Sequence, residues 1–130
     1  SELSKVASGG ELSRLMLTLK ALLATKKKLP SIIFDEIDSG VSGDVANKIG
    51  NILFEMGKQM QVIAITHLPQ LASKGKRHLF VFKKDDDQKT QSFISYLEGE
   101  DRVQEIAKML SAGKLTKTAI SNAKELLETP

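Results

Sequence analysis

The stretch Ser31-Ile32-Ile33-Phe34-Asp35-Glu36 decides the fold and points to the chemistry. It is a short apolar run with Leu29-Pro30 in front and Asp38-Ser39-Gly40 behind, which is typical of a buried β-strand bounded by turns. Two carboxylates at the end of such a strand are costly unless a ligand uses them. Open α/β sheets bind ligands outside the carboxyl ends of their strands. A metal-bound phosphate, with a water to be activated, suits this pair.

A helix is predicted on each side of this strand. Apolar residues recur at helical spacing from Glu11 to about Lys26, and Pro30 forbids continuation. Ser42 is a suitable N-cap for a second helix, whose apolar face is Val45, Ile49, Ile52, Leu53 and Met56. A second apolar run follows at 62–66. This order of strand, helix and strand predicts a parallel pair.

The remainder of the chain adds strands and helices. After Pro69 a short helical stretch runs to about Ser73. Runs at 78–83 and 92–97 predict two strands, and the acids and lysines at 84–88 suit a solvated turn between them. Two helices follow, separated by Gly113. Their apolar faces are Val103, Ile106, Ala107 and Leu110, and then Ala119, Ile120, Ala123, Leu126 and Leu127. The pattern indicates an α/β protein.

Composition narrows the class of protein. The 130 residues suffice for one domain with a core, and 41% hydrophobic with 27% charged content indicates a globular chain. No apolar run is long enough for a bilayer, so no membrane partner is expected. There is no cysteine, which excludes disulfides and is compatible with a reducing cytoplasm. The sequence begins at Ser1 without Met and enters a motif at once, so we expect a piece of a longer protein.

Three places carry possible chemistry. Asp35 can hold Mg²⁺, directly or through water, and Glu36 can orient and deprotonate an attacking water. Ser8-Gly9-Gly10-Glu11 precedes a helix, where glycines and unpaired backbone N–H groups allow an anion to approach. His67 follows the second strand and would share an edge with the acidic pair in a parallel sheet. The ordinary alternatives are a solvated acidic loop, a capped helix start and a structural histidine.

Taken in order, these motifs resemble the C-terminal half of an ABC-type ATPase head. Ser8-Gly9-Gly10-Glu11 resembles the signature and Ile32-Ile33-Phe34-Asp35-Glu36 resembles Walker B with its catalytic glutamate. Ser39-Gly40-Val41-Ser42-Gly43 occupies the D-loop, and Thr66-His67 resembles the H-switch. The residues within these motifs are most similar to those of the SMC-like ATPases of bacterial DNA repair. The resemblance implies the C-terminal lobe of a P-loop NTPase, with a partly parallel sheet, flanking helices and no Walker A lobe.

The resemblance also implies a role for each motif. Asp35 would help to hold Mg²⁺, mainly through water, Glu36 would polarise the attacking water, and His67 would contact the γ-phosphate and sense its loss. The residues that would bind ATP held by a partner head are Ser8, Gly9, Gly10 and Glu11. The D-loop residues would be Ser39, Gly40, Val41 and Ser42. Transporter-type heads usually have Pro and Asp where Ile37 and Ser42 stand, which weighs against a transporter subunit.

One part of an ATP site is missing from these residues. A phosphate-binding loop needs Gly-x-x-x-x-Gly-Lys-Ser/Thr. The nearest candidate, Ala112-Gly113-Lys114-Leu115, lacks the final hydroxyl, has Lys108 in place of the first glycine and lies between helices. We therefore expect this chain alone to bind ATP poorly and to hydrolyse it negligibly, whereas the intact head would use ATP and Mg²⁺.

The resemblance implies partners for the intact protein. They are the N-terminal Walker A lobe of the same protein, a second head in a homodimer, and DNA, in a cytoplasmic, nucleoid-associated protein that repairs double-strand breaks. The basic clusters 26–28 and 74–77 could contact DNA phosphates or form a solvated face. We expect one lobe over 1–130, with the signature helix at 1–28, the sheet core at 29–98 and terminal helices at 99–130. The alternatives are another SMC-like or ABC-type head and an interaction module with vestigial ATP motifs.

Overall fold

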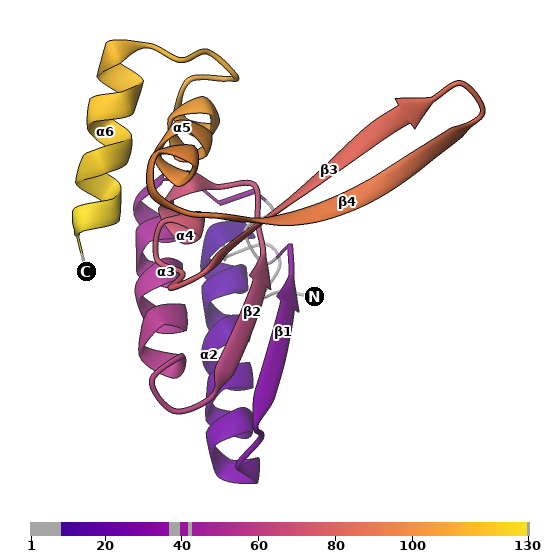
Figure 1. Ribbon diagram of the computed structural model, residues 1–130. Helices are drawn as coiled ribbons and strands as arrows, with labels where there is room; N and C mark the ends of the chain where they lie inside the picture. Colours follow the sequence, from indigo (N-terminus) through magenta and orange to yellow (C-terminus); the bar gives the residue numbers. More distant parts are fainter. Residues whose placement is uncertain (1–8, 37–39, 42, 130) are drawn as a thin grey trace. The chain divides into compact units, whose positions relative to one another are not determined.

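The computed structural model describes residues 9–36, 40, 41 and 43–129, with side chains described from residue 16 onward (Figure 1). The chain divides into two compact units, 1–74 and 75–130. Each unit contains a two-stranded sheet of its own. The boundary between the units therefore lies inside the segment 29–98, which the sequence predicts as one sheet core. The predicted assignment of 1–28, 29–98 and 99–130 to the signature helix, the sheet core and the terminal helices stays a prediction.

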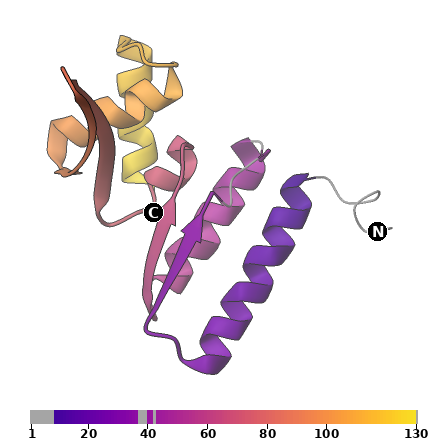
Figure 2. The same ribbon diagram turned by 90° about the vertical axis from the view of Figure 1, so that its right-hand side faces the viewer.

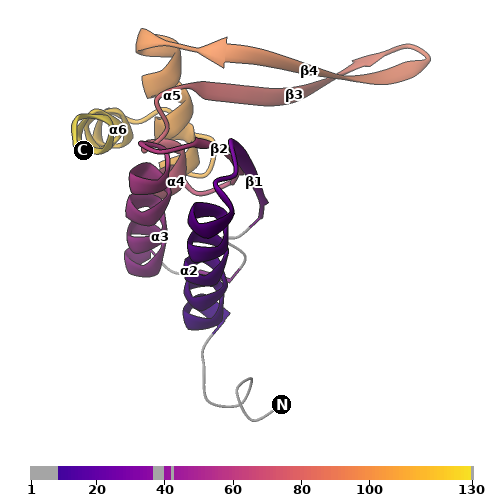
Figure 3. The same cartoon turned by 90° about the horizontal axis from the view of Figure 1, so that it is seen from below.

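The first unit is a strand pair with helices packed against it. Its elements, in chain order, are α2 (Gly9–Lys27), β1 (Ser31–Asp35), α3 (Gly43–Met56), β2 (Gln61–Ile65) and α4 (Pro69–Ala72). These bounds confirm the predicted order of helix, strand, helix and strand to within two residues at each end. Figure 3 shows α2 and α3 side by side on the same side of the two strands.

The two strands are parallel, as predicted. Their register pairs Ser31 with Gln61 at one end and Asp35 with Ile65 at the other. Because both strands run in the same direction, both carboxyl ends meet at one edge of the sheet. This edge carries the acidic pair and the histidine predicted to be functional.

The core of the first unit lies between the strands and the helices. Phe34 from β1 is 1% exposed and packs in a cluster with Leu17 of α2 and Ile49 of α3. The other buried members are Ala46, Leu53, Met56 and Leu71. Alternation along β1 gives the reason, since Phe34 points to the helices and Ile33 points away. The predicted apolar face of α3 is confirmed.

The first unit leaves apolar surface uncovered. On the sheet, Ile33 is 65% exposed and Ile65 is 52% exposed. On α2, Leu19, Leu22 and Leu23 are also exposed, with Leu22 at 64%, whereas Leu17 and Ala24 are buried. Apolar residues occur on nearly every side of α2, so periodicity predicted the helix but could not select its buried face. Exposed apolar patches of this kind mark surfaces that pack against further protein.

Helix α2 ends in a Schellman motif built on a lysine. The N–H of Leu29 donates to the carbonyl of Ala24 at 3.1 Å, and the N–H of Lys28 donates to Thr25 at 3.3 Å. Lys28 has a φ of 54°, the left-handed conformation that side chains with a Cβ disfavour. The lysine therefore adds positive charge at the helix end at a conformational cost.

We expect Lys28→Gly to stabilise the first unit by about 1 kcal/mol, because glycine adopts this conformation without strain. Urea unfolding followed by circular dichroism measures the change. Lys26→Gly is the matched control, since it removes the same charge from a residue inside α2 and should destabilise by up to about 1 kcal/mol. Equal effects of the two substitutions would contradict the assignment.

The second unit begins with a long antiparallel hairpin. Strands β3 (His78–Asp86) and β4 (Lys89–Leu97) are nine residues each, longer than predicted. Most of the predicted turn at 84–88 is wrong, because Asp86 pairs with Lys89 and only Asp87 and Gln88 form the turn. A two-residue turn closes the ladder fully, and a 2.7 Å hydrogen bond from Thr90 Oγ1 to Asp85 Oδ1 helps to hold its end.

Two helices complete the second unit. They are α5 (Gly99–Leu110) and α6 (Lys117–Glu128), packed through Ile106, Ala107, Ala119 and Ala123, which are at most 5% exposed. The predicted apolar faces are confirmed. The Thr116 hydroxyl accepts a 3.0 Å hydrogen bond from the N–H of Ala119 and caps α6. At the start of β3, burial and the nearby Arg102 guanidinium lower the pKa of His78, so its neutral form is favoured.

Candidate functional site at the carboxyl ends of the parallel strands

The sheet edge of the first unit brings together two of the three predicted site segments. Asp35 ends β1 opposite Ile65, and the N–H of Glu36 donates to the carbonyl of Ile65 at 3.1 Å. Thr66 and His67 follow Ile65 directly. The parallel register thus extends one residue beyond the strand and places the acidic pair beside the histidine segment. The side chains of Asp35, Glu36 and His67 are exposed, and a ligand could reach them.

Glu36 has an unusual backbone. Its φ is 53°, and a residue other than glycine adopts this left-handed conformation at a cost of about 1–3 kcal/mol. The hydrogen bond to Ile65 fixes the peptide on the N-terminal side of this bend. The chain therefore leaves the line of β1 immediately after Asp35. The sequence gives no signal for this bend, because glutamate is not a residue that favours it.

His67 sits in a short turn between β2 and α4. The Thr66 hydroxyl accepts a 3.0 Å hydrogen bond from the N–H of Leu68, which closes the turn around the histidine. Pro69 then begins α4, where its fixed φ suits the first helical position and its missing N–H is no loss. The role of Thr66 in this turn was not predicted. A threonine three residues before a helix-initiating proline is the sequence signal that could have indicated this turn.

Only some of the predicted signature residues are among the residues that the structure describes. Ser8 lies outside the described residues, whereas Gly9, Gly10 and Glu11 form the first turn of α2. Figures 1 and 2 show that α2 starts at the end of the unit where β1 and β2 finish. The described part of the signature therefore lies at the same end of the first unit as the acidic pair and His67.

The D-loop residues follow Glu36 and precede α3. Ser39 and Ser42 lie outside the described residues. Gly40 is exposed with a φ of 73°, a conformation that suits glycine, and Val41 is half-buried against the core. The loop thus has one side anchored in the unit. Its assignment as a D-loop stays a prediction.

The residues present fit a magnesium ion held mainly by a nucleotide. Among the residues that the structure describes, no three His, Asp or Glu side chains are grouped as a metal site. Mg²⁺ in nucleotide enzymes commonly uses one or two carboxylates together with substrate phosphates and waters. An exposed Asp35 at a strand end is such a carboxylate. An all-protein metal cage is therefore not the kind of site that these residues offer.

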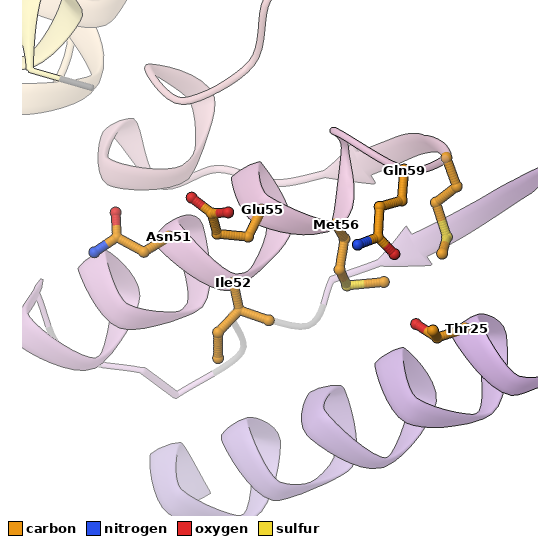
Figure 4. Close-up of a pocket in the computed structure, with 7 residues that line it drawn as sticks. Thr25, Asn51, Ile52, Glu55, Met56 and Gln59 are labelled. Atoms are coloured by element: carbon orange, nitrogen blue, oxygen red, sulfur yellow. The ribbon is translucent and has the colours of Figure 1, made fainter.

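The hollow shown in Figure 4 lies elsewhere in the first unit. It has a volume of about 410 Å³ and is lined by Thr25, Asn51, Ile52, Glu55, Met56, Gln59 and Met60. These residues belong to the C-terminal halves of α2 and α3 and the turn after α3, so none of the predicted site residues is among them. The candidate chemistry is at an open sheet edge instead, as expected for a site completed by other protein.

The fold defines the class of protein. No family model matches the chain. The solved Smc head domain of Pyrococcus yayanosii, with its coiled coil and joint, superimposes with a TM-score of 0.69 at 22% identity and covers 84% of this chain and 20% of that one. A second structure, from work on ATP-driven dimerization and DNA-stimulated activation of SMC ATPases, gives a TM-score of 0.66 at 21% identity over 86% of this chain and 66% of that one. The chain has the fold of an SMC-type ATPase head lobe.

Sequence similarity then specifies the type within that class. The DNA repair protein RecN of Vibrio cholerae is 44% identical over 125 residues, which is 96% of this chain and 23% of that protein. The chain is therefore a RecN-type segment and spans less than a quarter of the curated relatives that it matches. This similarity confirms the predicted resemblance, and the covered share fits a C-terminal segment. In the described residues no helix is long and apolar enough to cross a membrane.

Proposed function

We propose that this chain supplies Walker B, the signature and the H-switch to a composite ATP site formed by two heads of a RecN-like ATPase. The observation that carries the proposal is the parallel register, which sets Asp35 and Glu36 beside Thr66 and His67 at one sheet edge. Phosphoryl transfer depends mainly on positioning and charge neutralisation, and these groups are suited to both. The activity, the partners and a cytoplasmic, nucleoid-associated location in double-strand break repair belong to the whole protein.

In this proposal each described residue has one task. Asp35 would hold Mg²⁺, mainly through bound water, and the ion would neutralise charge on the β- and γ-phosphates when it is bound. Glu36 would accept a hydrogen bond from the attacking water and take its proton. His67 would donate to the γ-phosphate oxygen. The signature residues, which are Ser8 outside the described part of the chain and Gly9, Gly10 and Glu11 in the first turn of α2, would contact ATP on the partner head.

The uncovered apolar surface supports a further part of the proposal. The outer face of β1 and β2, with Ile33 at 65% exposure, would pack against the Walker A lobe of the same protein. Burying this side chain would contribute at most about 1.5–3 kcal/mol to the contact between the two lobes. DNA would bind the full-length protein, and the exposed Lys26, Lys27 and Lys28 are suited to phosphate contacts.

ATP-dependent dimerisation tests the composite site. The chain joined to the phosphate-loop lobe of its own protein should shift from one head to two on adding ATP and Mg²⁺, as measured by light scattering, and ADP should not cause the shift. Ser8→Arg should abolish dimerisation, because it places a bulky side chain at the partner's phosphate, whereas Ser4→Arg should retain it. An interaction module with vestigial motifs would show no response to either nucleotide.

A further inference from the structure

Helix α3 carries a glycine in its interior at a point of close approach. A Cβ atom on Gly50 would lie 3.1 Å from the carbonyl oxygen of Gln70 and 3.1 Å from Cγ of Lys74. Gln70 lies in α4, and Lys74 lies two residues after the end of that helix. An interior glycine costs about 1 kcal/mol relative to alanine in a helix. The missing side chain is thus what allows α4 to lie directly on α3.

A second glycine continues the same stripe of α3. Gly43 precedes Gly50 by seven residues, which is two turns along one helix face. A Cβ on Gly43 would lie 3.6 Å from Nε2 of Gln70, an ordinary contact. Among the described residues, the buried Oε1 of Gln70 has no hydrogen-bond partner. The close approach of the two helices is therefore at Gly50, where an added Cβ would lie only 3.1 Å from the carbonyl oxygen of Gln70.

The remaining contacts of α4 leave it little freedom. Leu71 is 5% exposed in the core cluster, and Ser73 is 7% exposed. The N–H groups of Leu71 and Ala72 both donate to the carbonyl of Leu68, which ties the helix to the turn that holds the histidine. His67 is therefore held between the end of β2 and the start of α4. A shift of α4 on α3 would move the turn.

We propose that Gly50 is a positioning residue for His67, acting through its contact with the backbone of Gln70. This inference rests on the proposed function, in which His67 contacts the γ-phosphate. Because α3 starts directly after the D-loop, the same contact couples the D-loop side of the unit to the H-switch. A misplacement of about 1 Å can lower the rate of a positioned reaction by up to about 10²-fold. The glycine is in the sequence, but its partner 20 residues later is known only from the fold.

Gly50→Val tests the proposal, with Asn47→Val as the matched control because Asn47 is an exposed residue of the same helix. In the 130-residue chain, Gly50→Val should shift the ring resonances of His67 in NMR spectra, and Asn47→Val should leave them in place. In the intact protein, Gly50→Val should lower kcat for ATP by about tenfold and leave KM within about twofold. Gly50→Ala should show smaller changes in the same direction. This variant provides the test if the valine variant does not fold.

The two readouts separate failure of this inference from failure of the proposed function. Unchanged His67 resonances in folded Gly50→Val and Gly50→Ala chains would overturn the positioning role, whatever the ATPase activity. Shifted resonances with unchanged kcat, in an intact protein whose turnover still depends on Glu36, would also overturn it. An intact protein without ATP turnover would instead contradict the proposed function, while the resonances would still report on the contact.

Discussion

Glu36→Gln in the intact protein should leave ATP binding nearly unchanged and lower turnover by about 10²–10⁴-fold, the usual contribution of a general base. Glutamine keeps the size and shape of the side chain and can still hydrogen-bond a water, but it cannot take the proton. Steady-state phosphate release measures turnover, and equilibrium binding of labelled ATP measures affinity. Because hydrolysis would separate the heads, the variant should also accumulate as an ATP-bound dimer.

Glu55→Gln provides the matched control for this prediction. Glu55 is also an exposed carboxylate of the first unit, but it lies on α3 beside the hollow of Figure 4, where it pairs with Lys58 at 3.0 Å. Its replacement should change turnover by less than about twofold, because Glu55 is not among the proposed site residues and the loss of its exposed ion pair should affect stability by at most about 1 kcal/mol. Normal hydrolysis by the Glu36→Gln protein would refute the general-base assignment.

The isolated 130-residue chain should hydrolyse ATP at least about 10³-fold more slowly than the intact protein, and should bind it weakly. In the proposed site, the groups at the strand ends would bind metal and water, but the triphosphate would be held by a phosphate-binding loop, whose motif does not occur in these residues. Since catalysis of phosphoryl transfer is mostly positioning, a nucleotide that is not held is not hydrolysed. Comparison of phosphate release by equal concentrations of both proteins provides the measurement.

Adding the phosphate-loop lobe as a separate polypeptide should restore turnover, because the exposed outer face of β1 and β2 is available to pack against it. Ile33→Lys should prevent the restoration by placing a charge in that interface. Lys48→Ala, an exposed change on α3, should not. Rapid hydrolysis by the pure chain alone would show that it holds the triphosphate by other means, and the composite site would then be wrong.

Local patterns predicted the elements of this protein well. Short apolar runs located the strands and period-3.6 apolar spacing located the helices, and Pro30 and Pro69 marked boundaries that the structure keeps. The hairpin turn at 84–88 was wrong because acidic, lysine-rich residues are compatible with both a solvated turn and an exposed ladder. The exposed leucines of α2 were beyond pattern analysis, since that helix is apolar on nearly every side.

The candidate site could be predicted as a set of residues but not as an arrangement. Asp35, Glu36 and His67 were selected because their side chains follow apolar strands, a feature of the sequence alone. The left-handed φ of Glu36 was not predictable, because the residue type opposes it and only the hydrogen bond to Ile65 supports it. The closeness of Gly50 to Gln70 was equally hidden, although a glycine inside an amphipathic helix is a signal of close approach.

By itself, the sequence determined that Ser31-Ile32-Ile33-Phe34-Asp35 forms a strand with Glu36 directly after it, because apolar runs and turn signals are local properties of the chain. The strand was predicted to be buried, but only Phe34 is, because burial depends on the rest of the fold. Only the tertiary structure decided that the end of this strand lies beside Thr66 and His67, and that α4 rests on Gly50. These juxtapositions depend on strand register and helix packing, which are set by contacts between residues far apart in the chain. The uncovered faces of β1, β2 and α2 are likewise a tertiary property, and they indicate where the remaining protein would complete the site.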